Sequence, residues 1–141
     1  MRIMVSACLL GEKCKYNGAD NFCQAVSALA QELELIPVCP ELAGGLPVPR
    51  LPCEIVGGTV MNSAGENVDK AFRAGAAECV RLAKEKEIDL AILQPRSPSC
   101  GVHEIYDGTF SGRRIAGSGV FASLLRESGF RIMDADEWKQ I

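Results

Sequence analysis

Residues 3–11 read Ile-Met-Val-Ser-Ala-Cys-Leu-Leu-Gly, a mainly apolar stretch in which a cysteine is followed by a glycine three residues later. A short apolar run at the start of the chain, over residues 1–7, predicts a buried strand. Cys8 follows this run directly and precedes a turn that contains Gly11. In an open parallel sheet the carboxyl ends of the strands converge on one edge, where ligands bind. The stretch therefore predicts a thiol at the ligand-binding edge of such a sheet.

Two further cysteines have the same context. Cys39 ends the apolar run 35–38 and precedes a turn rich in proline and glycine. Cys100 lies in 97–101, Ser-Pro-Ser-Cys-Gly, just beyond the apolar run 90–93. If these runs are strands of one parallel sheet, three thiols distant in sequence can meet at one edge. This pattern indicates a metal or cluster site, or a nucleophile with helper groups, whereas the plainer interpretation is three separately buried thiols.

Strand-like and helix-like segments alternate along the chain. Apolar residues at helical spacing predict helices over 21–33, 67–86 and 119–128. Short apolar runs predict strands over 35–39, 88–93 and 130–133, a hairpin of 54–56 with 59–61 at the sheet margin, and a turn of helix over 136–139. Asn21 is the expected N-cap of the first helix, and the proline-rich segment 37–52 is expected to be an irregular loop. This order predicts one three-layer, Rossmann-like α/β domain over residues 1–141 with a mainly parallel central sheet.

Composition limits the classes of function. The net charge of −3 provides no basic surface for a nucleic-acid polymer. No apolar run is long enough to cross a bilayer, and the first residues form a strand rather than an export signal. We therefore expect a cytoplasmic protein without a membrane partner. The odd count of seven cysteines agrees with reduced thiols rather than a disulfide framework.

The spacing of the cysteines bears on the kind of metal site. Structural zinc sites usually use close cysteine pairs, and no Cys-x-x-Cys occurs here. Three widely spaced thiolates without an obvious fourth suit a cubane iron–sulfur cluster that has one open iron. Such an iron prefers a soft ligand, which makes a sulfur-bearing substrate attractive. Composition and spacing alone leave this as one option among several.

Three other residues could take part in chemistry. His103 is the only histidine, and it stands three residues after Cys100, where it could be a general base or simply a surface side chain. Glu41 stands two residues after Cys39 in the expected loop, where a carboxylate near a metal centre would be a natural acid or base. Ser97 could cap the turn around Pro98 or orient a small polar ligand.

The motifs also carry a resemblance that extends over nearly the whole chain. They are Ser6-Ala7-Cys8-Leu9-Leu10-Gly11, Cys14-Lys15-Tyr16-Asn17-Gly18, Pro37-Val38-Cys39-Pro40-Glu41, Gly44-Gly45-Leu46, Pro49-Arg50, Ser97-Pro98-Ser99-Cys100-Gly101 and Tyr106-Asp107-Gly108-Thr109-Phe110. Together, and in this order, they resemble a bacterial family that was long catalogued as a domain of unknown function. One branch of that family is the thiouracil desulfidases. Two positions depart from the pattern: residues 94–96 lack the lysine that relatives often carry, and Cys53 stands where a small residue is expected.

The resemblance implies a specific site and reaction. By motif, a [4Fe-4S] cluster with one iron not bound by protein would be held by Cys8, Cys39 and Cys100. Glu41 would be the acidic helper and Ser97 the hydroxyl helper. The implied activity is non-redox removal of sulfur from a small thiolated nucleobase such as 2-thiouracil, with release of hydrogen sulfide.

Two other classes of function remain open at this point. The chain could be a metal- or cluster-binding module without turnover, such as a sulfur carrier. It could also be a cysteine-nucleophile hydrolase that uses Cys100 and His103. Absorption spectra with iron and sulfide analysis on anaerobically purified protein would separate these classes.

Overall fold

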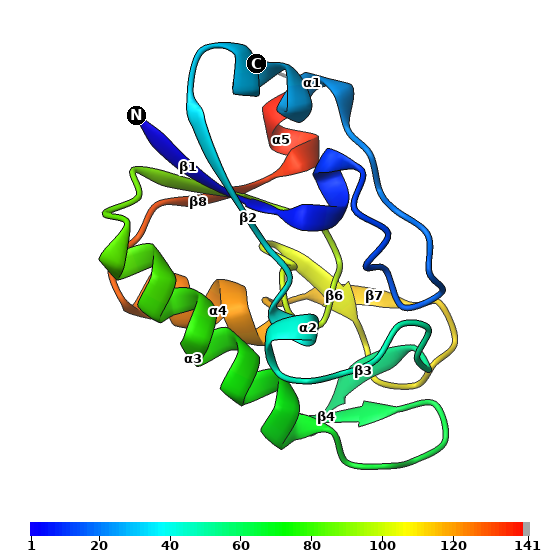
Figure 1. Ribbon diagram of the computed structural model, residues 1–141. Helices are drawn as coiled ribbons and strands as arrows, with labels where there is room; N and C mark the ends of the chain where they lie inside the picture. The colour runs from blue at the N-terminus through cyan, green and yellow to red at the C-terminus, as the bar shows by residue number, and fades with distance from the viewer. Residues whose placement is uncertain (140–141) are drawn as a thin grey trace.

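The computed structural model describes residues 1–139 and contains a four-stranded parallel sheet in the order β2-β1-β5-β8 (Figure 1). The strands are β1 (Arg2–Ser6), β2 (Glu34–Val38), β5 (Leu90–Leu93) and β8 (Ile132–Asp134). All three pairings in this sheet are parallel, and Ile3 lies level with both Leu35 and Leu90. The central parallel sheet expected from the sequence is confirmed.

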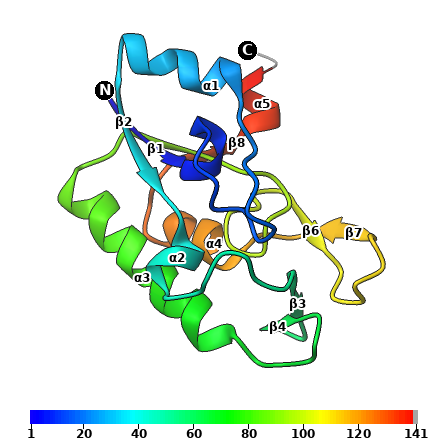
Figure 2. The same ribbon diagram turned by 45° about the vertical axis from the view of Figure 1, so that its right-hand side comes forward.

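Helices cover both faces of the sheet. Figures 1 and 2 show α3 (Asp69–Glu85) and α4 (Val120–Glu127) on one face, with α1 (Gln24–Ser27) and α5 (Ala135–Lys139) on the other. Side chains of β1 alternate between the two layers, as the two-residue period of a strand requires. Met4 packs with α3 and α4, while Ile3 and Val5 pack on the opposite side with Val26 and Ala135. The expected three-layer α/β class is therefore confirmed.

The long helix α3 follows its sequence pattern closely. Its buried positions are spaced as one helical face, comprising Phe72, Gly75, Ala76, Cys79, Val80 and Ala83. The Oδ1 atom of Asn67 accepts the N–H of Asp69 at 2.9 Å, which satisfies one of the free donors at the helix start. Cys79 belongs to this apolar core.

The expected helix over 21–33 is shorter and less regular than predicted. It begins at Gln24, with Cys23 rather than Asn21 at the N-cap, and it tightens into a 3₁₀ segment, η2 (Ala28–Gln31). The cause is tertiary pairing. The N–H groups of Asn21 and Cys23 are donated to the carbonyls of Cys8 and Leu9, which holds residues 21–23 extended against the turn after β1.

Two antiparallel hairpins extend below the sheet (Figure 2). The first is formed by β3 (Cys53–Val56) and β4 (Thr59–Asn62), close to its predicted bounds, but it is a separate two-stranded sheet rather than a margin of the central one. The second, β6 (Glu104–Tyr106) with β7 (Arg114–Ala116), is absent from the sequence-based expectation. Buried Glu54 links the two hairpins, because its Oε1 atom accepts the N–H groups of Gly108 and Phe110.

The sequence predicts an irregular loop over segment 37–52, but part of this segment is helical in the structure. The segment contains a one-turn helix, α2 (Pro40–Ala43), which starts with Pro40 at a position where a helix tolerates proline. This turn crosses α3 at very short range. A Cβ atom on Gly75 would lie 1.8 Å from the Pro40 carbonyl oxygen, and one on Gly44 would lie 2.0 Å from that of Ala71. Gly75 therefore fixes the position of the turn that carries Glu41.

This crossing makes a testable prediction for Gly75→Ala. Glycine to alanine within a helix normally stabilises by about 1 kcal/mol. Here we expect the opposite effect: the free energy of unfolding should fall by at least about 2 kcal/mol, because the added methyl overlaps backbone atoms of α2. Urea unfolding of parent and variant at the same cluster content measures this change in the free energy of unfolding. The control is Ala74→Gly at the neighbouring exposed position, which should cost about 1 kcal/mol. A more stable Gly75→Ala protein would contradict the close crossing.

Within residues 1–139, none of the helices combines the length and the apolar character needed to cross a bilayer.

Candidate functional site

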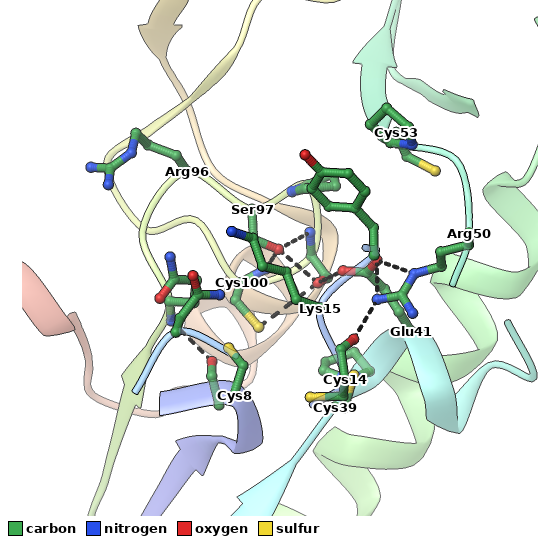
Figure 3. Close-up of a pocket in the computed structure, with 18 of the residues that line it drawn as sticks. Cys8, Cys14, Lys15, Cys39, Glu41, Arg50, Cys53, Arg96, Ser97 and Cys100 are labelled. Atoms are coloured by element: carbon green, nitrogen blue, oxygen red, sulfur yellow. Dashed lines mark hydrogen bonds and ion pairs between the residues drawn. The ribbon is translucent and has the colours of Figure 1, made fainter. Parts of the chain in front are cut away.

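A pocket of about 640 Å³ opens at the carboxyl ends of β1, β2 and β5 (Figure 3). It is lined by five of the seven cysteines, Cys8, Cys14, Cys39, Cys53 and Cys100. Charged, hydroxyl and aromatic side chains complete the lining, including Glu41, Arg50, Ser97, Ser99, Lys15, Arg96, Tyr16, Tyr106 and Phe110. The five residues that the resemblance implies, Cys8, Cys39, Glu41, Ser97 and Cys100, therefore lie in one cavity, whereas the other candidate, His103, does not.

The three strand-end thiols reach the pocket for the reason that the sequence suggested. Cys8 lies in η1 (Ala7–Leu10), the 3₁₀ turn directly after β1, and Cys39 is the N-cap residue between β2 and α2. Cys100 follows β5 at a greater distance, in the turn formed by residues 97–101. Gly101 is required in that turn, because a Cβ atom there would lie 2.8 Å from the carbonyl oxygens of Ser97 and Glu104.

Two more cysteines share the pocket. The thiol of Cys14 is buried and lies within hydrogen-bonding reach of both Cys8 and Cys39. Cys53 begins β3 and lies beyond Arg50, away from the other four thiols (Figure 3). Sequence reasoning left Cys14 ambiguous and gave no role to Cys53, and neither lies at the end of a strand of the central sheet.

Most of these thiols are held protonated at neutral pH. Burial raises the pKa of Cys100 to about 12 and that of Cys53 to about 11. The pKa of Cys39 is raised by its hydrogen bond with Cys14 and by burial. Only Cys8 has a lowered pKa, chiefly because Cys14 donates a hydrogen bond to it. Since a metal-bound thiol is deprotonated, metal binding here would release protons.

The spacing of these thiols tests which metal group they fit. In a tetrahedral zinc site the sulfurs would be separated by about 3.8 Å, given Zn–S bonds of about 2.3 Å. In the part of the chain that the structure describes, the only group of three or more potential ligands with all ligand atoms within 4.8 Å is His103, Asp134 and Glu137. No such group of thiols is preformed for a single ion. At least one pair among the sulfurs of Cys8, Cys39 and Cys100 is therefore more than 4.8 Å apart, which agrees with a cubane cluster, whose ligand sulfurs lie about 6–7 Å apart.

Glu41 projects into the same pocket and is held by a partly buried ion pair. Its Oε1 atom accepts a hydrogen bond from Nε of Arg50 at 3.0 Å, and Nη2 of Arg50 makes an ion-pair contact with the same oxygen at 3.0 Å. The side chain of Arg50 is 7% exposed and that of Glu41 is 14% exposed. Arg50 also donates to the carbonyl oxygens of Cys14 at 2.9 Å and Pro47 at 3.1 Å. One guanidinium therefore joins the acidic helper to the segment that carries Cys14.

Sequence reasoning gave no role to Arg50. Its signals in the sequence were the Pro49-Arg50 motif of the resemblance and its place in a proline-rich segment nine residues after a glutamate. We expect Arg50→Met to destabilise the protein by about 3 kcal/mol, because it leaves a buried carboxylate and two carbonyls without their donor. Denaturant unfolding of parent and variant at matched cluster content measures the loss. The control is Arg81→Met, which breaks only exposed ion pairs and should leave the unfolding midpoint near that of the parent.

Ser97 organises the turn that contains Cys100. Its Oγ atom accepts the N–H groups of Ser99 and Cys100, both at 3.1 Å. It also lies 3.0 Å from Oγ of Ser99, whose hydroxyl donates to Oε2 of Glu41 at 2.8 Å. The interpretation of Ser97 as a cap of the turn is therefore confirmed, and since Ser97 also lines the pocket, its role toward a ligand stays a prediction. The direct contact between Ser99 and Glu41 could not be read from residues 58 positions apart.

His103 does not join this site. Its side chain is 58% exposed, and Nε2 contacts Oε1 of Glu137 at 2.6 Å on α5. A nucleophilic cysteine needs a lowered pKa and a neighbouring base. Cys100 has neither, because its pKa is raised by burial and its sequence neighbour His103 is not among the pocket residues. The arrangement does not favour a cysteine-nucleophile hydrolase.

Comparison with known proteins agrees with this geometry. The family model of 2-thiouracil desulfurase matches residues 3–137. The chain belongs to this family. It is 41% identical to the uncharacterized protein YbbK of Bacillus subtilis (strain 168), over 99% of each chain. It also superposes with a TM-score of 0.93 on a solved structure of the [4Fe-4S]-dependent thiouracil desulfidase TudS, with 38% identity over 99% of this chain and 93% of that one.

Membership of the 2-thiouracil desulfurase family confirms the resemblance read from the motifs, and it confirms an enzyme of this kind. The alternative of a metal- or cluster-binding module without turnover, such as a sulfur carrier, is therefore not favoured. The high TM-score also agrees with the predicted fold class.

Proposed function

We propose that this enzyme removes sulfur from a thiolated pyrimidine base such as 2-thiouracil, using a [4Fe-4S] cluster held by Cys8, Cys39 and Cys100. The observation that carries the proposal is the meeting of three strand-end thiols with Glu41 and Ser97 in one pocket. When bound, the cluster supplies a soft Lewis-acid iron, not ligated by the protein, that favours the sulfur of the substrate. The raised pKa values of Cys39 and Cys100 agree with thiols that ionise only on metal binding.

The side chains of the pocket provide the remaining chemistry. Glu41 accepts a proton from the water that attacks the ring carbon, and Arg50 holds its carboxylate in place. Ser97 orients a ring nitrogen or carbonyl oxygen of the base. Sulfur leaves as hydrosulfide and the base retains the oxygen of water, so the overall reaction needs neither oxidant nor reductant.

The expected partners follow from the same pocket. We propose a free thiolated base as substrate rather than a nucleic-acid polymer, since the net charge of −3 gives no basic field for a polyanion. We also propose that the chain acts as one α/β domain in the cytoplasm, where thiols and an exposed cluster iron remain reduced.

One experiment tests the function. The protein is purified and reconstituted without oxygen, its iron and sulfide are measured, and 2-thiouracil is added while sulfide and uracil are followed. We expect both products in equal amounts, and none from the iron-free protein. A fully iron-loaded protein that binds 2-thiouracil without releasing sulfide would instead support the non-catalytic carrier.

A further inference from the structure

Ser99 occupies a central position that the reaction described above does not use. It is 1% exposed, and its hydroxyl lies between two groups of the site. Oγ of Ser99 is 2.8 Å from Oε2 of Glu41 and 3.0 Å from Oγ of Ser97. A third neighbour, Sγ of Cys100, is more distant at 3.8 Å. Since the one hydroxyl proton of Ser99 can serve only one acceptor well, the short contact with a carboxylate takes it.

The donor and the acceptor can be assigned for each hydrogen bond in the series Ser97–Ser99–Glu41. A serine hydroxyl has one proton and two acceptor sites. Both acceptor sites of Ser97 Oγ are used by the N–H groups of Ser99 and Cys100. In the contact between the two hydroxyls, Ser97 is therefore the donor and Ser99 the acceptor. Ser97 therefore donates to Ser99, and Ser99 donates to Glu41, so that both hydroxyl protons point toward the carboxylate.

Arg50 binds the other oxygen of the Glu41 carboxylate. It occupies Oε1 of Glu41 with one hydrogen bond from Nε and one ion-pair contact from Nη2, so Oε2 is the oxygen that meets Ser99. The carboxylate is thus fixed on one side by a guanidinium and on the other by a hydroxyl. A proton from a molecule beside Ser99 reaches Oε2 through this one hydroxyl without movement of Glu41.

We propose that Ser99 relays the proton of the attacking water to Glu41 while Ser97 keeps Ser99 oriented, an inference that rests on the proposed desulfuration. As the oxygen of water bonds to the ring carbon, its O–H bond breaks and the proton passes to the remaining acceptor site on Oγ of Ser99, which lines the pocket. The proton of Ser99 passes to Oε2 of Glu41, while the hydrogen bond from Ser97 to Ser99 stays in place. Each serine ends with one proton, Glu41 becomes the neutral acid, and the same path returns the proton to the departing sulfur.

The test uses the cluster-loaded protein with Ser99→Ala. We expect iron content and affinity for 2-thiouracil to equal those of the parent, while turnover falls about 100-fold, as for the loss of a proton-transfer group. The double variant with Glu41→Gln should lose no more than Glu41→Gln alone, because groups that act as one unit are not additive. Ser118→Ala is the matched control: its hydroxyl also donates to a partly buried acceptor, the Val102 carbonyl, but it lies outside the pocket.

Two further readouts complement the rates of the variants, and the first of them does not require turnover. In the infrared spectrum, the carboxylate band that Glu41→Gln removes should shift in Ser99→Ala and stay in place in Ser118→Ala, whether or not the protein turns over 2-thiouracil. In the parent, the rate in mixtures of H₂O and D₂O should curve with deuterium fraction, since more than one proton moves. Parental turnover in Ser99→Ala, an unshifted band or a linear dependence would overturn the relay. Absence of sulfide release by the loaded parent, with the band shifted, would instead count against the desulfuration alone.

Discussion

Replacing Cys8, Cys39 or Cys100 by serine is expected to reduce cluster iron to background. A serine oxygen is a poor ligand for iron in a soft, sulfur-rich site, and two remaining thiolates do not hold a cubane. Iron and acid-labile sulfide, measured with the absorption spectrum after anaerobic reconstitution, give the result for each variant. The unfolding midpoint of each cluster-free variant shows whether its fold survives.

Two cysteines of the same chain provide the controls. Cys53→Ser changes a thiol that lines the same pocket from the start of β3, and it should retain the iron of the parent. Cys79→Ala removes a buried thiol from the core against α4, and it should cost some stability through lost packing while the iron stays. Parental iron in Cys39→Ser would disqualify Cys39 as a ligand, and the same logic applies to Cys8 and Cys100.

The central sheet could be predicted because its two inner strands, β1 and β5, are short apolar runs that are buried on both faces. For β1, four of the five residues are buried, and three of these four are apolar. Once the strand ends were placed, the meeting of Cys8 and Cys39 followed from the parallel topology, and Cys100 joins them through the turn after β5. The three thiols could therefore be predicted as a constellation from the sequence.

The errors fall where distant contacts override local preference. The N–H groups of residues 21 and 23 are used by carbonyls of the turn after β1, which delays a helix that the apolar spacing places three residues earlier. All three residues of β7 are exposed, so the strand has no buried face to give a two-residue pattern. Its pairing with β6 becomes visible only in three dimensions.

The supporting residues of the site were hidden for a related reason. Arg50 and Ser99 act through Glu41, yet they lie 9 and 58 residues from it in the chain. Sequence motifs reveal residues that stand at strand ends or in unusual turns. They do not reveal which buried donor completes the hydrogen bonding of a carboxylate, because that depends on how α2 packs against the loop after β5.

Glu41→Gln should separate cluster binding from chemistry. Glutamine keeps the size of the side chain, and its carbonyl oxygen can still accept the hydrogen bond from Arg50 at the position of Oε1, but its amide nitrogen in place of Oε2 cannot take up a proton. We expect the variant to retain its iron and its affinity for 2-thiouracil, while turnover falls at least about 100-fold, as for a lost general base. Anaerobic sulfide release, with iron measured in the same sample, gives both quantities.

His103→Gln is the comparison that makes this assignment specific. His103 is the other ionisable residue near Cys100 in sequence, but its ring faces Glu137 at the protein surface. Its replacement should leave turnover close to that of the parent, because the side chain is not among those lining the pocket. If Glu41→Gln kept near-parental turnover while His103→Gln lost it, the proton transfer would belong to His103. The carboxylate held by Arg50 would then serve only to support the walls of the pocket.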